Sequence, residues 1–587
     1  MTLALNRQLA NEDGSAAPTR ENAAGSCNSN SPGAEGAPDL LQGVRRSDIE
    51  LQPPCPWHES LEWQLSRLYW REQGLLPFVQ NTIPYVINNS GRLSEHAAVL
   101  LFENLSEHEP PPGEIVVLEL GAGTGLFAKL FLDAFRYICQ EQGRDYYERL
   151  RYVVSDHSPR TLEHWRERGL FEEHAEQALL AEVDALQPSV ARTSSGVRSL
   201  AGVRAVFCNY VLDVLPATIW RRHAGRIEEL LLSTHLSAED ALRGFTSLTL
   251  DEVRACASGP EPSQLLPLLP QLEVEVRFAR PRKLERWGAA AEALLGELGD
   301  GARLAINFGA FDALQNCLGC LASHGFLLLN DYGAVGSAST LGCGGPQRFG
   351  NTLALGLTFP LLERCMADLG FSVVAPPGDD ERQVHTRLLS HVPLERTQAA
   401  LVQRFSVEVE RALDADVLAA RQHAAAGRTG DALDAYRVAL ERVPNDWHLL
   451  GEIAEYVGPT VRDFEAGCAI AQRALDLNPW TSSWLWNVLG DCYYYQGRYA
   501  DAHQAFSCAE RLDPNDVRTN LNLGHSFASL AKYPEALVAL ARGLSHDSGA
   551  YRSLLLQQQE QVLAALAQRH TALQEGLVRR AERFGAA

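Results

Sequence analysis

The stretch Glu114-Ile-Val-Val-Leu-Glu-Leu-Gly-Ala-Gly-Thr-Gly125 decides the fold of the larger part of this chain. Its first seven residues are a short, β-branched apolar run, which predicts a buried strand. The strand runs directly into Gly121-Ala-Gly123-Thr-Gly125 and then into the helical sequence LFAKLFLDAFRYI. Because glycines lack the side chains that would keep a ligand away from the backbone, we expect a ligand at the carboxyl end of this strand.

Further strand-like runs follow at intervals that leave room for helices. They are RYVVSD (151–156), ALLAEVDA (178–185), RAVFCNYV (204–211) and GFLLLNDYG (325–333). Strands that alternate with helices predict parallel βαβ units, and therefore an α/β Rossmann-like domain, which we place at residues 57–395. The sequence between about 220 and 300 breaks the alternation and is interpreted as an inserted lobe.

The ends of the chain differ from this domain. Residues 1–56 are rich in Gly, Ala, Ser, Asn and Pro, and such a composition predicts a disordered tail. From about residue 410 the sequence is helical and self-similar, with prolines at 444, 479 and 514 after Ala-rich amphipathic helices. The prolines recur every 35 residues. A repeat of this length predicts stacked helix pairs over residues 410–565, followed by a capping helix or tail over 566–587.

Composition excludes several classes of function. The 587 residues include 52 Lys and Arg against 73 Asp and Glu, a net charge of −21 that disfavours nucleic acid as a partner. No apolar run approaches the ~20 residues that span a bilayer, and no secretion signal begins the sequence, so we expect a cytoplasmic protein without membrane association. Of the twelve cysteines, only Cys317 and Cys320 are close together, without a second pair at zinc spacing, and no metal is expected.

Polar residues at successive strand ends narrow the choice of ligand. Leu126 stands where a dinucleotide-binding fingerprint needs its third glycine, and no Gly-Lys-Ser/Thr follows as a phosphate-binding loop would require. Asp156, Asp184 and Asn209 end the second, third and fourth strands. One such residue is more often a turn or cap residue, but three at neighbouring strand ends favour a shared binding site.

The segment from Glu119 to Gly125 resembles motif I of the class I S-adenosylmethionine-dependent methyltransferases. The resemblance implies that S-adenosylmethionine binds at Glu119, Gly121, Gly123 and Gly125, with Asp156 at the ribose, Asp184 near the adenine and Asn209 beside the methyl donor. NYVLDVLP (209–216) and NDYG (330–333) resemble the MidA-like methyltransferases, which include the mitochondrial complex I assembly arginine methyltransferase. For an arginine substrate, Asp213 and Asp331 are the candidate catalytic carboxylates.

The helical region resembles tetratricopeptide repeats. Residues 483–516 carry the diagnostic positions, namely Trp486, Leu489, Gly490, Tyr493, Ala502, Phe506, Ala509 and Pro514. Four repeats are expected, the second of them irregular. The resemblance implies a protein or peptide partner on the concave face of the array, which would include Trp484, Asn487, Asp491 and Tyr494.

Three interpretations of function remain open. The first is an enzyme that methylates a protein positioned by the repeats. The second is a catalytically inactive cofactor-binding or scaffold protein, because Tyr210 stands where the MidA-like family has Glu. The third is a small-molecule methyltransferase whose repeats serve assembly.

Overall fold

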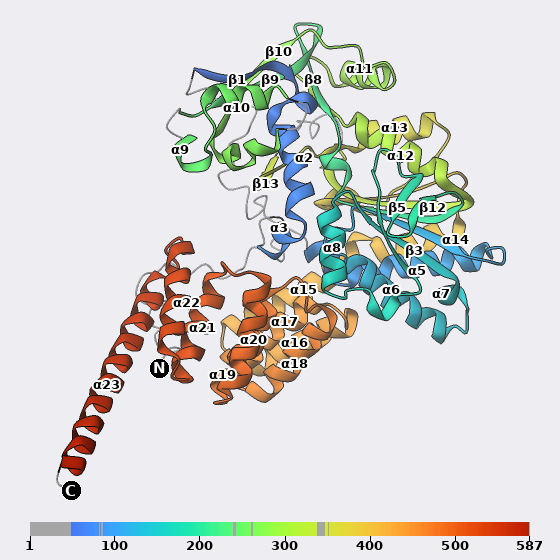
Figure 1. Cartoon of the computed structure of the whole chain (residues 1–587). Helices are drawn as coiled ribbons and strands as arrows, with labels where there is room; N and C mark the ends of the chain where they lie inside the picture. The colour runs from blue at the N-terminus through green and yellow to red at the C-terminus, as the bar shows by residue number, and fades with distance from the viewer. Residues whose placement is uncertain are drawn as a thin grey trace. The chain divides into compact units, whose positions relative to one another are not determined.

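The structure is a computed structural model that describes residues 48–80, 83, 86–238, 242–259, 262–336, 347–349 and 351–585 (Figure 1). The tail expected over residues 1–47 lies outside the described residues. The chain divides into two units, one containing residues 87–414 and the other residues 415–587. Among the described residues, no helix is both long enough and apolar enough to cross a membrane.

The first unit is built on a ten-stranded mixed sheet. Its central strands β2, β3, β4, β7 and β12 are parallel to one another, while β17 joins β12 antiparallel and β5 joins β4 antiparallel. The order along the sheet is β16 (Ser372–Val374), β17 (Val384–Ser390), β12 (Leu321–Ala334), β7 (Val203–Asn209), β2 (Ile115–Leu120), β3 (Leu150–Asp156), β4 (Ala178–Glu182), β5 (Val190–Thr193) and β6 (Gly196–Ser199). The tenth strand, β15 (Leu357–Thr358), pairs parallel with the end of β12. This parallel centre with helical crossovers confirms the Rossmann-like prediction.

Helices cover the two faces of this sheet. Leu118 and Val206 pack into one core with α11 (Gly288–Leu298), α12 (Phe308–Cys320) and α13 (Phe359–Asp368). The opposite face packs on α6 (Leu126–Glu141), where Phe131 contacts Tyr152 and Phe207, and α6 packs in turn on α5 (Arg92–Glu107). Each strand therefore ends between two helical layers, and the strand ends form one edge where polar side chains can gather.

A second, antiparallel sheet forms the inserted lobe. It contains β8 (Thr218–His223), β9 (Arg226–Leu236), β10 (Leu272–Ala279) and β11 (Arg303–Ile306), with α9 (Leu242–Phe245) and α10 (Leu250–Ala257) nearby. β1 (Ile49–Pro56) pairs with β9. This strand contradicts the expectation that a disordered tail reaches residue 56, because pairing with β9 supplies the backbone hydrogen bonds that its proline-rich composition did not predict.

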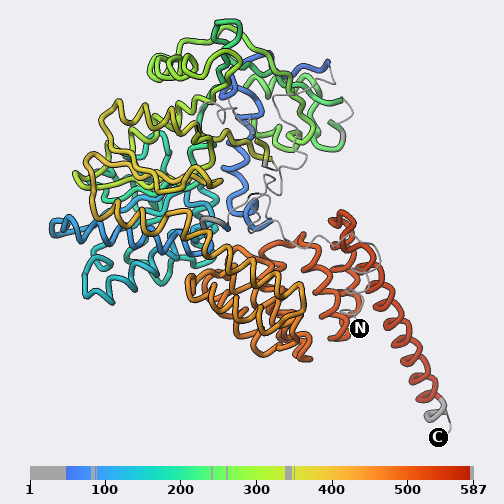
Figure 2. Tube along the Cα trace, turned by 180° about the vertical axis from the view of Figure 1, so that it is seen from behind, coloured from blue at the N-terminus to red at the C-terminus, as the bar shows by residue number. Residues whose placement is uncertain are grey.

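The second unit is all helical. Four helix pairs follow one another: α15 (Val407–Ala425) with α16 (Thr429–Arg442), α17 (Trp447–Glu455) with α18 (Phe464–Leu477), α19 (Ser483–Tyr495) with α20 (Tyr499–Leu512), and α21 (Val517–Ser529) with α22 (Tyr533–His546). In the second pair a π-helical turn, Tyr456–Thr460, extends α17. The last helix, α23 (Arg552–Gly585), runs past the pairs (Figure 2). It is continuous across residue 566, where the sequence placed a boundary.

Candidate functional site

The loop after β2 is fixed on every side by hydrogen bonds. Gly121, Gly123 and Gly125 all have left-handed backbone torsions, with φ of 60°, 50° and 76°. The backbone N–H of Gly123 donates to Asp156 Oδ2 at 3.1 Å, and its carbonyl accepts from Trp165 Nε1 at 3.1 Å. Left-handed torsions favour glycine, so the three glycines give this loop a shape that other residues would strain. We name residues 121–125 the glycine loop.

Asp156 ends β3 beside the glycine loop. Its two carboxylate oxygens accept from the N–H groups of Gly123 and Ser158, the latter at 2.9 Å. Burial raises the pKa of this partly buried carboxyl, whereas these N–H donors lower it. Because each carboxylate oxygen has two lone pairs, Asp156 can still accept two more hydrogen bonds.

Glu119 and Asp184, two other predicted cofactor residues, have partners of their own. Glu119 is buried, Tyr152 donates to its Oε2 at 3.0 Å, and burial raises the pKa of the Glu119 carboxyl to about 8. Asp184 is exposed and lies two residues after the end of β4, where its Oδ1 accepts from the N–H of Leu186 at 2.9 Å. Glu119 therefore lies inside the domain, and Asp184 caps a turn at the rim of the same edge.

The loop after β7 packs directly on the glycine loop. A Cβ on Gly121 would lie 2.6 Å from Val211 Cγ2, so only glycine allows the two loops this approach. Tyr210 has a left-handed φ of 55°, which is rare for an aromatic residue, and its ring stacks on Tyr332 at 4.8 Å between centroids. Strained backbone of this kind gathers at functional sites. We name residues 209–213 the asparagine loop.

Asn209 is oriented by a chain of hydrogen bonds across three strands. Thr386 Oγ1 on β17 donates to Asn330 Oδ1 at 2.7 Å, and Asn330 Nδ2 on β12 donates to Asn209 Oδ1 at 2.8 Å. Asn209 Nδ2 is buried, and within the described residues it has no hydrogen-bond partner. The sequence indicated Asn209 but not Asn330 or Thr386, because their roles depend on strand register.

Asp213 and Asp331 form a buried pair of carboxyls. Asp331 is inaccessible to solvent, and its oxygens accept from the N–H groups of Leu212 at 3.0 Å and Tyr332 at 2.8 Å. Asp213 Oδ1 is buried without a hydrogen-bond partner among the described residues. Burial raises the pKa of Asp213 to about 7, and burial together with the Asp213 charge raises the pKa of Asp331 well above its usual range. The pair therefore holds a proton at neutral pH.

Comparison with known proteins shows which families the two parts of the chain are similar to. Residues 97–362 match the model of the family described as "Putative S-adenosyl-L-methionine-dependent methyltransferase", and residues 483–516 match the tetratricopeptide repeat model. The match covers most of the α/β domain, which is therefore similar to this methyltransferase family. S-adenosylmethionine is accordingly the cofactor indicated for it, and the prediction of a methyltransferase followed by a tetratricopeptide repeat is confirmed.

Solved structures resemble each part at low identity. A candidate methyl transferase from Burkholderia thailandensis bound to S-adenosyl-homocysteine is 13% identical, aligns over 59% of this chain and 90% of its own, and gives a TM-score of 0.39. MamA protein is 16% identical over 27% of this chain and 94% of its own, with a TM-score of 0.22, and pilF of Pseudomonas aeruginosa is 19% identical over 31% and 81%, with a TM-score of 0.24. Among curated proteins, no sequence matches this chain.

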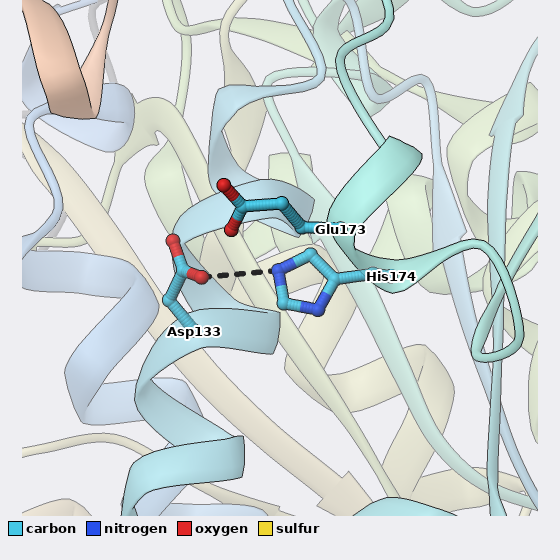
Figure 3. A group of neighbouring side chains, drawn as sticks. All are labelled: Asp133, Glu173 and His174. Carbon is cyan, nitrogen blue, oxygen red and sulfur yellow. Dashed lines mark hydrogen bonds and ion pairs between the residues drawn. The ribbon is translucent and has the colours of Figure 1, made fainter.

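A separate cluster in the methyltransferase domain has the donor types of a metal site. Asp133, Glu173 and His174 approach one another between α6 and the turn at Glu172–His174 (Figure 3). Lys129 Nζ lies 2.6 Å from Asp133 Oδ2, while His174 bonds Asp133 Oδ1 at 3.0 Å and Tyr147 OH at 2.7 Å. Burial raises the pKa of Asp133, but the hydrogen bonds and charges of His174 and Lys129 outweigh burial and hold this pKa below its usual value. These contacts already neutralise the carboxylate, so the cluster is interpreted as a structural network.

The four repeat residues expected on the concave face lie in contacts between helix pairs. Asn487 is fully buried and donates to Thr519 Oγ1 at 2.7 Å, so it is unavailable to a partner and that prediction is wrong. Asp491 Oδ2 accepts from Arg518 at 2.7 Å, Trp484 Nε1 donates to Glu455 at 2.9 Å, and Tyr494 OH meets Ser529 Oγ at 3.1 Å. These three are part-exposed and remain candidates for partner contact.

Proposed function

We propose that the α/β domain is an active S-adenosylmethionine-dependent methyltransferase whose acceptor is a protein, with an arginine side chain as the favoured target. One observation carries this proposal. Three buried polar atoms without partners among the described residues, Asn209 Nδ2, Tyr210 OH and Asp213 Oδ1, lie in one five-residue loop against Gly121. Because buried polar atoms are normally hydrogen-bonded, such a group is best explained by a ligand that completes it.

The residues present fit the cofactor. The glycine loop offers backbone without side chains, Asp156 has acceptor capacity for two ribose hydroxyls, and Asn209 Nδ2 is a free donor at the neighbouring strand end. Asp184 stands at the rim, where it would reach the adenine amino group. We assign Glu119 the indirect role of supporting this edge through Tyr152. When bound, the cofactor supplies an electrophilic methyl group on a sulfonium.

The two acidic residues take different roles in this proposal. Asp331 accepts two backbone N–H groups and so holds the asparagine loop in place. Asp213 has the unpartnered oxygen and a pKa of about 7, which suits a group that takes a proton from a nucleophile near neutral pH. A displacement of this type otherwise depends on alignment and exclusion of water, which the buried loop provides.

Charge and ring geometry favour a guanidinium as the acceptor. A guanidinium pairs with carboxylates and stacks on aromatic faces. Asp213 supplies a carboxylate once it has lost its proton near neutral pH, and the stacked rings of Tyr210 and Tyr332 lie in the same loop region. In this interpretation Tyr210 replaces the family's Glu without removing catalysis, because Asp213 remains as the base.

Transfer of a labelled methyl group to lysate proteins tests the proposal. We expect label in protein with the wild-type enzyme, about 100-fold slower labelling with Asp213→Asn, and equal cofactor affinity for both by calorimetry. Binding without transfer to any acceptor would favour the inactive scaffold that Tyr210 left open. Label confined to small molecules would favour the third interpretation, and absence of cofactor binding would remove the proposal altogether.

We propose that the repeats recruit the protein substrate. The repeat family is built to bind peptides along stacked helices, and Trp484 and Tyr494 offer part-exposed aromatic anchors. Trp484→Ala combined with Tyr494→Ala should lower protein methylation and leave cofactor affinity unchanged. Because both side chains also bond neighbouring helices, thermal melting of the same sample must be normal for the result to count.

A further inference from the structure

Two cysteine side chains meet where the second helix pair of the repeats packs on the third. Cys468 lies on α18, directly after Gly467, and Cys492 lies on α19, one helical turn before Gln496. Gln496 Nε2 donates to Cys468 Sγ at 3.3 Å. Cys468 is partly exposed, whereas Cys492 is buried. The part-exposed Cys468 sulfur thus contacts Gln496 on α19, one turn from Cys492, and the buried Cys492 sulfur lies against Gly467, the neighbour of Cys468 on α18.

The backbone around Cys492 is shaped to admit this sulfur. A Cβ on Gly467 would lie 2.9 Å from Cys492 Sγ, and a Cβ on Gly458 would lie closer still. Gly458 belongs to the π-helical turn Tyr456–Thr460, and π-helical turns within α-helices are frequent at functional sites. The irregularity that distinguishes the second repeat therefore lies against the thiol pair.

The surroundings divide the two thiols into a nucleophile and a proton-bearing partner. Donation from Cys492 and Gln496, helped by the charge of Arg498, lowers the pKa of Cys468 to about 7 although burial opposes it. The shared hydrogen bond and burial raise the pKa of Cys492. By contrast, burial raises the pKa of Cys139 to about 12 and that of Cys365 to about 11. About half of Cys468 is therefore thiolate, the reactive form, at pH 7.

We infer that Cys468 and Cys492 are a reversible redox pair that closes a disulfide between the second and third helix pairs. With hydrogen peroxide as oxidant, the Cys468 thiolate attacks one peroxide oxygen, the O–O bond breaks, and hydroxide leaves. The Cys492 sulfur then displaces hydroxide from the Cys468 sulfenic acid, its proton completing a second water. The net reaction converts two thiols and one peroxide into one disulfide and two waters. A dithiol reductant reverses it.

We expect the disulfide to alter the neighbouring surface that Glu455, Asp491 and Arg518 form. Arg518 donates to Glu455 at 2.7 Å and to Asp491 at 2.7 Å, so it joins the second and fourth pairs through the third. Asp491 directly precedes Cys492 in α19. A covalent link from Cys492 to α18 fixes the spacing of the helices that carry this bridge, and oxidation should thereby change the affinity of any peptide bound there.

Mass spectrometry of the intact chain tests the inference. Reduced protein is treated with an equimolar amount of hydrogen peroxide at pH 7.5, alkylated and digested without reductant. We expect a peptide pair joined through Cys468 and Cys492, which a dithiol removes, and a melting temperature of the repeats higher by about 5 °C. A disulfide that joins other cysteines, or two free thiols after treatment, would overturn the inference.

Three variants separate chemistry from loss of fold. Cys492→Ser should leave a Cys468 sulfenic acid that a dione reagent captures, whereas Cys508→Ser, a part-exposed thiol on α20, should leave the cross-link intact. Gln496→Ala changes an exposed residue and removes one donor to the thiolate. It should move the midpoint of Cys468 alkylation, near pH 7 in the wild type, to higher pH. An unchanged midpoint, or equal capture of sulfenic acid in wild type and Cys492→Ser, would contradict the redox pair.

Discussion

The glycine loop and the asparagine loop sit side by side but satisfy their polar groups in opposite ways. In the glycine loop, neighbouring strands and helices occupy the backbone groups of Gly123 on both sides. In the asparagine loop, Asn209 Nδ2 and Asp213 Oδ1 stay without partners among the described residues, and Tyr210 is held in a left-handed conformation. The backbone of the glycine loop is therefore held rigidly where a ligand can bind, whereas the asparagine loop keeps polar atoms that are free to bond a cofactor or substrate.

The largest expected effect breaks the glycine loop. Gly123→Val should reduce affinity for S-adenosylmethionine by about 100-fold or more, because a side chain at a φ of 50° strains the loop and occupies the approach to its backbone. Calorimetry measures the loss. Gly143→Ala is the matched control, because Gly143 has a φ of 61° with no atom within 4 Å of an added Cβ. Equal affinity in the two variants would show that the glycine loop does not contact the cofactor.

The next effect separates the two loops by function. Asp213→Asn should reduce the rate of methyl transfer by about 100-fold while cofactor affinity stays at the wild-type value, because it removes the proposed base. In the wild type the rate should rise with pH around 7, as the pair loses its proton. A variant that keeps the wild-type rate and pH profile would refute the role of Asp213.

Two buried carboxyls, Asp213 in the asparagine loop and Glu119 on β2, predict two windows in the pH dependence of stability. A carboxyl with a raised pKa binds its proton more tightly in the folded state, so the free energy of unfolding falls as pH rises from its unfolded pKa to its folded pKa. For Asp213 this window ends near pH 7, and for Glu119 near pH 8. Urea unfolding should show that Asp213→Asn flattens the fall in stability between pH 3.8 and about 7, and that Glu119→Gln flattens the fall between pH 4.5 and about 8, each by about 4 kcal/mol. Identical curves for all three proteins would mean that neither carboxyl is protonated in the fold.

The smallest expected effect comes from the hydrogen bonds that orient Asn209 in the asparagine loop. Thr386→Val removes the donor to Asn330 Oδ1, so Asn330 no longer fixes Asn209. We expect kcat to fall about five-fold, with a loss of stability of about 1 kcal/mol, since one buried acceptor is left unpaired. Thr352 is also buried but takes no part in the hydrogen bonds that orient Asn209, so Thr352→Val is the control for loss of a buried hydroxyl. The same kcat in both variants would argue that the hydrogen bonds from Thr386 through Asn330 to Asn209 have only a structural role.

Local signals were sufficient for much of this fold. The β-branched run into glycines placed β2 and its loop, and Asp156 and Asn209 end strands as predicted. The proline period placed the repeat at 483–516. Contacts between residues far apart in the sequence could not be predicted. Strand register brings Asn330 opposite Asn209, and helix packing buries Asn487. Composition misassigned the end of the tail for the same reason, because the partner of β1 lies far along the chain.

That first strand has a consequence for how the protein folds as it is made. Leu236, the partner of Ile49, is synthesised roughly 190 residues later, a delay of about 10 to 40 s at ordinary elongation rates. During this interval an unpaired strand would be exposed to other nascent chains. Pro53 and Pro54 fall where the register with β9 shifts, at a break in the ladder that tolerates them. Their missing N–H groups make the waiting strand a poor template for intermolecular pairing, so the prolines protect the nascent chain until β9 emerges.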